Sequence, residues 1–317
     1  MSDKFNVLIF DCYNVFLRWE SFKHEQISTV DGKKVHVEGI LGFFEAINTY
    51  ILKYGTDDCK CYFLMDNADT MYERKQISEL YKNDRNLQYY QHRELDFIEL
   101  ILHYYKDNSY LFRVPKYEAD DYVPNILRCW IKKDDNVLLI SEDLDWSKFI
   151  SNNVSQYMKH KIFTPSLFEE TFGYKPTVSN VTFDKVFYGD DSDNIIGTLP
   201  NLSRNFFKMI IEKYNEPKSF IQSAIKGELN FLDMGWRMKI EKEQENILKN
   251  WDIVTSIHIS DEDLCTYKYS CSFKKNKLFI IYSALDVLGK FDKRIKNDVS
   301  QNGIFDMLNG VTLNRKK

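Results

Sequence analysis

Residues 137–145 read VLLISEDLD, four apolar residues followed by a segment with three acids. The same pattern occurs at residues 5–11, FNVLIFD, and at residues 61–66, CYFLMD. Short continuous apolar runs are typical of buried strands in a parallel sheet. Helical spacing at residues 39–54 and 118–132 alternates with these runs, which favours an α/β fold with a mostly parallel central sheet and helices on both faces.

The second half of the chain has a different pattern. Helical spacing recurs there at residues 181–189, 203–214, 216–227 and 240–257. Residues 264–282 regain the alternation of a strand around residues 268–273, and residues 278–289 then have helical spacing. We therefore expect three parts: a core at 1–178 with a basic segment at about 70–95, a helical segment at 179–257, and a C-terminal region at 258–317 that packs on the core.

The composition limits the class of protein. Hydrophobic residues make up 44% and aromatic residues 15% of the 317, which is enough for a sizeable core and excludes a disordered chain. The six cysteines form no CxxC pair, as expected for reduced thiols in a cytoplasmic protein, or in the host cytoplasm if the source is viral. No signal peptide and no run of 18 apolar residues is present, so we expect no membrane partner.

Acidic residues gather at the ends of the predicted strands and helices. They are Asp11, Asp66, Glu118, Asp120, Asp121, Asp143, Asp145, Asp190 and Asp193. A lone aspartate after a strand is usually a turn residue or a helix cap, but the carboxyl ends of parallel strands meet at one edge of a sheet. So many carboxylates repel one another unless cations lie between them, and oxygen ligands select Mg²⁺ or Mn²⁺. Two such ions about 4 Å apart are a common arrangement for phosphodiester hydrolysis.

A basic segment follows Asp66 directly. Arg74, Lys75, Lys82 and Arg85 are mixed there with tyrosines such as Tyr81. Composition alone also fits a solvated helix, but cations and aromatic rings together are what contact with single-stranded nucleic acid requires. Setting the nine acids aside changes the net charge of −4 to +5, so the rest of the chain can attract phosphates.

Five motifs in this order resemble the acidic motifs of the flap endonuclease and 5′-nuclease superfamily, and within it the ribonucleases H of T-even bacteriophages. They are LIFDCYN (8–14), FLMDN (63–67), YEADD (117–121), LLISEDLDW (138–146) and YGDDSDNIIG (188–197). The resemblance implies a 5′→3′ exonuclease or flap endonuclease with RNase H activity. Its substrates would be flapped, nicked or RNA-primed duplex DNA, in replication or repair, with a single-strand-binding protein or a sliding clamp as further partners.

The resemblance also implies roles for individual residues. Asp11, Asp66, Glu118 and Asp120 would hold a first Mg²⁺ ion with Asp143 nearby, and Asp121, Asp145, Asp190 and Asp193 a second, with Mn²⁺ as a substitute. Lys82, Arg74 and Lys75 would act in catalysis. Contacts to nucleic acid would come from Arg74, Lys75, Tyr81, Lys82, Arg85, Gly197, Arg204 and Lys208.

One segment departs from the family pattern. Most members carry a glycine–apolar–glycine hairpin followed by lysine, where this chain has Leu199-Pro200-Asn201-Leu202 and then Ser203. A close approach of the backbone to a phosphate, and a monovalent-ion site built on it, are therefore open questions. Two other functions also stay open from the sequence: a PIN-type ribonuclease, and a DNA-binding scaffold with reduced catalysis.

Overall fold

The structure is a computed structural model and describes residues 4–20, 27–30, 33–67, 72–79, 81–82 and 93–285. Within these ranges seven strands form a central sheet in the order β11-β5-β4-β1-β6-β7-β8. They span β1 Phe5–Asp11, β4 Gly55–Leu64, β5 Ser109–Phe112, β6 Val137–Ile140, β7 Val154–Met158, β8 Lys161–Phe163 and β11 Lys268–Cys271. The strands from β5 to β7 are parallel, and only β8 and β11 at the edges are antiparallel. The predicted α/β fold is confirmed, and its three strand–acid motifs occupy the neighbouring strands β4, β1 and β6.

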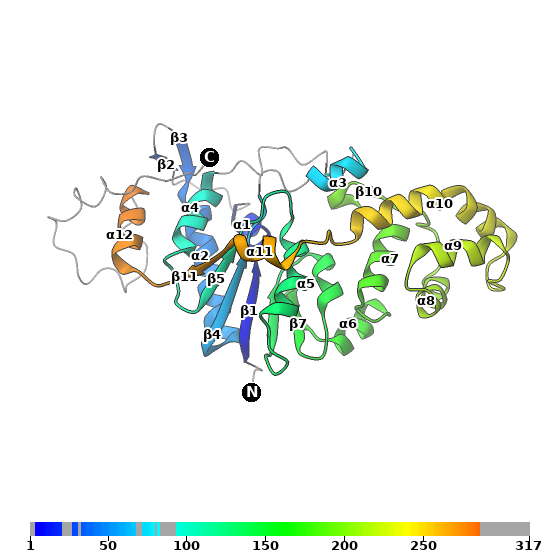
Figure 1. The fold of residues 1–317 in the computed structure, drawn as a ribbon, viewed down its shortest axis with the longest axis horizontal. Coiled ribbons are helices and arrows are strands. Elements are labelled where there is room, and N and C mark those ends of the chain that lie inside the picture. The colour runs from blue at the N-terminus through cyan, green and yellow to red at the C-terminus, as the bar shows by residue number, and fades with distance from the viewer. Residues whose placement is uncertain are drawn as a thin grey trace.

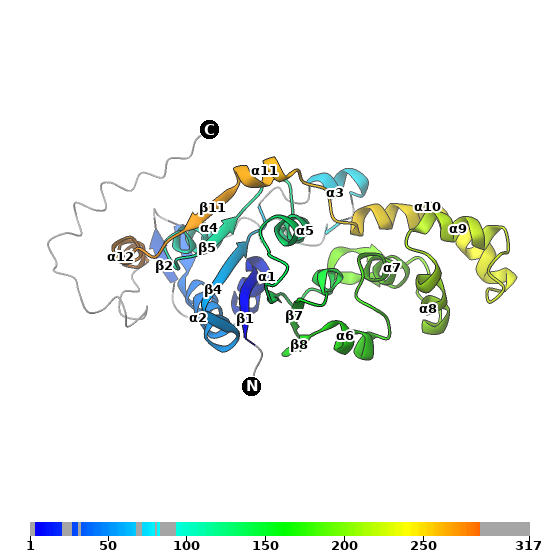
Figure 2. The same ribbon diagram turned by 60° about the horizontal axis from the view of Figure 1, so that its bottom comes forward.

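Both faces of the sheet are buried. Along β1, Leu8 and Phe10 belong to one apolar cluster, and Val7 and Ile9 to another on the opposite face. The first face is covered by helices α1 (Cys12–Glu20), α2 (Val37–Tyr54) and α4 (Arg93–Leu102). The second is covered by α5 (Ala119–Cys129) and α11 (Asp261–Thr266), as Figures 1 and 2 show. Burial on both sides explains why these strands are continuously apolar.

A group of helices extends to one side of the sheet (Figure 1, green to yellow). It comprises α6 (Pro165–Phe172), α7 (Val178–Tyr188), α8 (Arg204–Lys213), α9 (Pro217–Ile225) and α10 (Met234–Val254). Helix α7 packs on the short 3₁₀ helix η2 (Leu144–Phe149) that follows β6. Its Phe183 contacts Phe220 of α9 and Trp251 of α10 through ring pairs, so the helices share one apolar interior with the sheet.

The structure differs from the sequence prediction in several short elements. The pair β2 (Ile27–Val30) and β3 (Lys33–His36) and the two strands after η2 were not expected. The strand alternation expected around residues 268–273 corresponds to β11, and the helix expected at 278–289 overlaps α12 (Lys275–Ala284). Helix α11, which precedes β11, was not expected.

The basic segment is described in part. Helix α3 (Tyr72–Ile77) begins it and α4 begins at its end. Arg85, predicted to contact nucleic acid, lies outside the described residues. Among the helices that the structure describes, none is long and apolar enough to cross a membrane.

Candidate functional site

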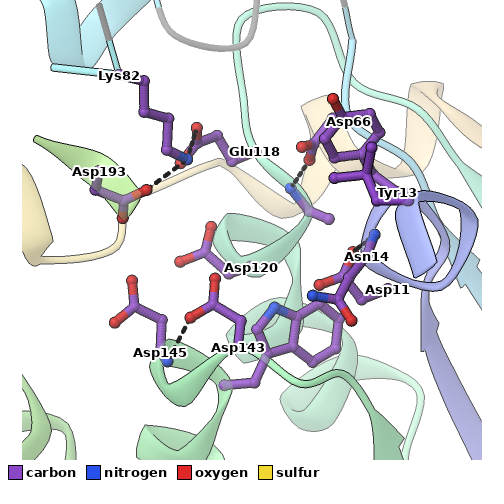
Figure 3. A pocket seen from close by; sticks show the side chains of 13 residues that line it. Asp11, Tyr13, Asn14, Asp66, Lys82, Glu118, Asp120, Asp143, Asp145 and Asp193 are labelled. Carbon is purple, nitrogen blue, oxygen red and sulfur yellow. Dashed lines mark hydrogen bonds and ion pairs between the residues drawn. The ribbon is translucent and has the colours of Figure 1, made fainter. Parts of the chain in front are cut away.

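A cavity of about 100 Å³ lies at the carboxyl ends of β1, β4 and β6 (Figure 3). Seven of the nine predicted acids line it: Asp11, Asp66, Glu118, Asp120, Asp143, Asp145 and Asp193. They come from three strand ends, from the start of α5, and from the short 3₁₀ helices η2 and η3 (Asp191–Asp193). The parallel register of three neighbouring strands brings Asp11, Asp66 and Asp143 together, as the motifs predict, and η3 adds Asp193 from the helical segment.

Asp11 and Asp66 are fixed by neighbours at the strand ends. The carboxylate of Asp11 accepts hydrogen bonds from the backbone amide of Asn14 (3.0 Å) and from the Ser141 hydroxyl (2.8 Å). Oδ1 of Asp66 accepts one from the backbone amide of Ala119 at the start of α5 (2.8 Å). One carboxylate is thus tied to the loop after β6, and the other to the first turn of α5.

Glu118 caps α5, and its carboxylate accepts hydrogen bonds from three side chains of the basic segment. Its carboxylate lies 2.8 Å from Nη1 of Arg74, 2.9 Å from the hydroxyl of Tyr81, and 2.6 Å from Nζ of Lys82. Nζ of Lys82 also lies 3.6 Å from Oδ1 of Asp193 (Figure 3). Lys82 therefore bridges the start of α5 and the segment around Asp193, directly in the cavity wall.

Asp121 faces away from the cavity. Its carboxylate forms a two-pronged ion pair with Arg74, with contacts of 2.8 and 3.1 Å, and accepts a hydrogen bond from the backbone of Ile257. Arg74 is 2% exposed and also donates to the carbonyl of Ile253 at the end of α10. In this structure Arg74 joins α3, α5 and α10, and its contact with nucleic acid stays a prediction.

The second group of acids surrounds a lysine that the sequence analysis missed. Nζ of Lys185 lies 2.7 Å from Asp145, 2.6 Å from Asp190 and 3.2 Å from Asp193. Lys185 is 3% exposed and lies one turn before the end of α7. A lysine beside apolar helix positions does not by itself predict a site residue. Its position five residues before Asp190 is the one feature of the sequence that could have indicated it.

Lys148 is a second cation that the sequence did not reveal. Its ammonium lies 3.0 Å from Oδ2 of Asp120, and the residue is 4% exposed. Although burial opposes it, Lys148 and Arg74 hold the pKa of Asp120 well below its usual range. The only feature of the sequence that could have indicated Lys148 is its position, three residues after Asp145 in the same 3₁₀ helix.

Other carboxyl groups in the cavity have raised pKa values. Burial, together with neighbouring negative charge, raises the pKa of Asp66 to about 8 and that of Asp11 to about 7. Burial also raises the pKa of Asp145 to about 7, against the opposing effect of Lys185. Near neutral pH the charged forms of these carboxyl groups therefore have too few cations nearby to stabilise them.

A buried glutamine organises the loop that carries Asp143 and Asp145. Nε2 of Gln156, on β7, donates to the carbonyls of Ser141 (3.0 Å) and Asp143 (2.7 Å), and its Oε1 accepts from the Ser147 hydroxyl (2.6 Å). Gln156 is fully buried. The conformation of this loop is therefore fixed by hydrogen bonds from Gln156 on the neighbouring strand β7.

The remaining predicted residues lie outside the cavity lining. Lys75 is half-buried on α3, and Lys208 is exposed on α8. Arg204 pairs with Asp184 and lies over the ring of Tyr188. Gly197 packs so closely that an added Cβ would lie 2.5–2.8 Å from the backbone of Tyr188 and Gly189, which gives this glycine a packing role. Their contacts with nucleic acid stay predictions.

The donor set fits a hard divalent cation by its chemistry. Carboxylate oxygens line the cavity, and Oδ1 of Asp145 is buried with no hydrogen-bond partner among the described residues. Within the same ranges, no three acid, histidine or cysteine side chains already converge closely enough to hold an ion. The ammonium groups of Lys82, Lys148 and Lys185 occupy contacts with these carboxylates instead.

The sequence places the chain in a family. The profile of the 5′-3′ exonuclease N-terminal resolvase-like domain matches residues 6–173, more than half of the chain. The protein therefore belongs to the 5′-3′ exonuclease family. None of the curated protein sequences matches it.

Solved structures of nucleases share its fold. The D15 protein of phage T5, co-crystallised with metal ions, is 19% identical with a TM-score of 0.59, over 91% of this chain and 97% of that one. The catalytic core of Rad2 in complex with DNA substrate is 12% identical with a TM-score of 0.52, over 92% and 90%. Human GEN1 in complex with Holliday junction DNA is 11% identical with a TM-score of 0.52, over 89% and 71%.

Proposed function

We propose that the protein is a divalent-metal-dependent 5′→3′ nuclease that hydrolyses phosphodiester bonds near the 5′ ends of flapped, nicked or RNA-primed duplex DNA. The observation that carries the proposal is the acidic cavity, where seven carboxylates and Lys82 face one another at the edge of the sheet (Figure 3). A similar structure adds support, since bacteriophage T5 D15 is a flap endonuclease whose structure holds DNA and metal ions.

Mg²⁺ is the proposed cofactor, as two ions, with Mn²⁺ able to replace it. Asp11, Asp66, Glu118 and Asp120 would hold one ion with Asp143 nearby, and Asp145, Asp190 and Asp193 the other. Asp121, which the resemblance also assigns to the second ion, would act there only after leaving its ion pair with Arg74. Cations held there would supply positive charge to the scissile phosphate and lower the pKa of an attacking water. The raised pKa values of Asp11 and Asp66 support this assignment, because these carboxyl groups gain most from added positive charge.

The chain's own residues position the substrate. Lys82, in the cavity wall, exchanges its contact with Glu118 for the phosphate and follows the charge that builds on the phosphoryl oxygens. Arg74 keeps α3 joined to α5, so that Lys82 stays at the cavity. Tyr81 fixes the carboxylate of Glu118 through its hydroxyl.

The proposed biological role is primer removal or repair, with RNase H activity on RNA–DNA duplexes. A single-strand-binding protein or a sliding clamp would act with it, in the cytoplasm. These proposals rest on the resemblance of the five acidic motifs to phage ribonucleases H, not on a contact in the structure.

The test is digestion of 5′-labelled flapped, nicked, blunt and RNA-primed duplexes with Mg²⁺, with product lengths read on a gel. We expect short 5′ products from flapped, nicked and RNA-primed duplexes, and none in EDTA. Cleavage of single-stranded RNA without action on flapped duplex would favour a PIN-type ribonuclease. Binding of flapped duplex without cleavage would favour a scaffold.

A further inference from the structure

A second cavity of about 210 Å³ lies beside the acidic one and is lined by residues that follow α3, by the β9–β10 turn and by α10. Helices α3 and α10 lie side by side at this place (Figure 1). Strands β9 (Gly189–Asp190) and β10 (Ile195–Ile196) form this turn. Ile196, Asn246 and Lys249 are exposed in the lining, so this side of the cavity faces solvent. The space suits one planar ring system and is too small for a folded segment of protein.

A thin wall separates the two cavities. Tyr81 and Asn194 line the second cavity, and the residues beside them in the sequence, Lys82 and Asp193, line the acidic one. The backbone amide of Lys82 donates to the carbonyl of Asp193 (3.1 Å), which closes the wall. Lys82 and Asn194 both have left-handed backbone conformations, with φ of 49° and 55°. A nucleic-acid strand bound at the acidic cavity therefore passes within reach of the second cavity.

The lining of the second cavity has hydrogen-bonding groups but little net charge. The hydroxyl of Ser78 and the side-chain amide of Asn194 make no hydrogen bond among the described residues and are available to a ligand. Ile253 and Tyr81 add apolar surface. Glu243 is the only acid and Lys249 the only basic residue in this lining, so phosphate and metal ions are poor ligands for it.

Part of the cavity is already held in shape. The amide of Asn250 donates to the carbonyl of Ile196 (2.8 Å), which joins α10 to β10. The amide of Asn246 donates to Glu243 (2.8 Å), one turn earlier on α10. A planar ring that carries hydrogen-bond donors and acceptors on its edge, and whose two faces are apolar, matches such a lining.

We propose that this cavity binds one nucleobase of the substrate strand, next to the nucleotide whose phosphate lies at the acidic cavity. The inference rests on the proposed function, because the strand must reach the acidic cavity first. The base would place its polar edge at Ser78 and Asn194 and a face against Ile253. The cavity would thus help to set the position of the strand relative to Lys82.

The test is abasic-site scanning in a binding experiment. Flapped duplexes, each lacking one base near the junction, are titrated with protein in Ca²⁺, and gels confirm that the DNA stays intact. We expect one position at which loss of the base weakens binding about tenfold. Asn246→Trp, which fills the cavity from its exposed side, should weaken binding of the complete substrate to a similar extent and remove the sensitivity at that position.

Glu245→Trp is the matched control, since Glu245 is an exposed neighbour on α10 that does not line the cavity. This variant should keep the sensitive position, and thermal unfolding should show both variants folded. Absence of any sensitive position, or the same sensitivity in Asn246→Trp, would overturn the inference. Saturable binding of free 2-aminopurine riboside that Asn246→Trp abolishes, without a sensitive position in DNA, would assign the cavity to free nucleosides and also overturn it. Failure of the unaltered protein to bind any flapped duplex would instead count against the proposed function.

Discussion

The ammonium of Lys185 lies 2.7 Å from Oδ2 of Asp145, so α7 places a buried cation against an acid of the loop after β6. The same ammonium contacts Asp190 and Asp193. Three carboxylates of the proposed second ion site are thereby held together by a residue of the chain itself.

Replacing Lys185 should make the fold depend on divalent ions. Lys185→Met leaves one buried carboxylate (Asp193) and two half-buried ones (Asp145 and Asp190) without their cation, and breaking a buried pair costs about 3–5 kcal/mol. We expect a loss of that size in the free energy of unfolding in EDTA, measured with urea, and a larger recovery by Mg²⁺ than in the unaltered protein. Lys213→Met, on exposed α8, is the control. Equal stability of the two variants in EDTA would show that the cluster does not need Lys185.

Lys82 should act on the chemical step more than on binding. Its ammonium lies in the cavity wall beside Glu118 (2.6 Å), where charge builds during attack on a phosphate. Lys82→Ala should slow single-turnover cleavage about 10²–10³-fold and change DNA affinity only a few-fold. Lys208→Ala, on the exposed face of α8, should do the reverse. Normal cleavage by Lys82→Ala at saturating DNA would remove Lys82 from the mechanism.

Gln156 should act as a positioning residue for the acidic loop. Gln156→Leu keeps the size of the side chain but removes the hydrogen bonds to Ser141 and Asp143. Loss of a residue that supports a metal ligand typically lowers metal affinity or activity 10–100-fold. We expect a shift of this size in the Mg²⁺ concentration for half-maximal cleavage, with a normal rate regained at high Mg²⁺. Gln222→Leu, exposed on α9, should leave the Mg²⁺ curve unchanged. A rate that stays low at all Mg²⁺ concentrations would indicate a different role.

The stability of the protein in EDTA should fall as the pH rises. In the folded protein burial raises the pKa of Asp66 to about 8 and those of Asp11 and Asp145 to about 7, from 3.8. Between about pH 4 and 8 the folded state therefore binds more protons than the unfolded state, and stability is lost as the pH rises through the folded values. Urea unfolding at pH 5, 6, 7 and 8 measures the slope, which Asp11→Asn should reduce. Stability that rises over this range would contradict the raised pKa values.

The sequence predicts the centre of the fold and the convergence of the acids. The reason is physical: β1, β4 and β6 are buried on both faces, so their apolar runs are continuous, and Asp11, Asp66 and Asp143 lie at or just after their carboxyl ends. Lys148 and Lys185 were not predicted, because a lysine that reaches into an acidic cavity has the same local sequence as one in solvent. The short strands β7 and β8 were missed because packing on neighbours, not periodicity, fixes them.

The most direct test of the account is cleavage by Asp11→Asn, an exchange of nearly equal size at the end of the central strand. Asp191→Asn is its control, since Asp191 is exposed and does not line the acidic cavity. With 5′-labelled flapped duplex and Mg²⁺, we expect Asp11→Asn to lose cleavage while it binds the duplex as tightly as the unaltered protein or more tightly, because negative charge near the phosphates is removed. Asp191→Asn should cleave normally. Undiminished cleavage by Asp11→Asn would contradict the assignment of the acidic cavity as the metal-dependent active site.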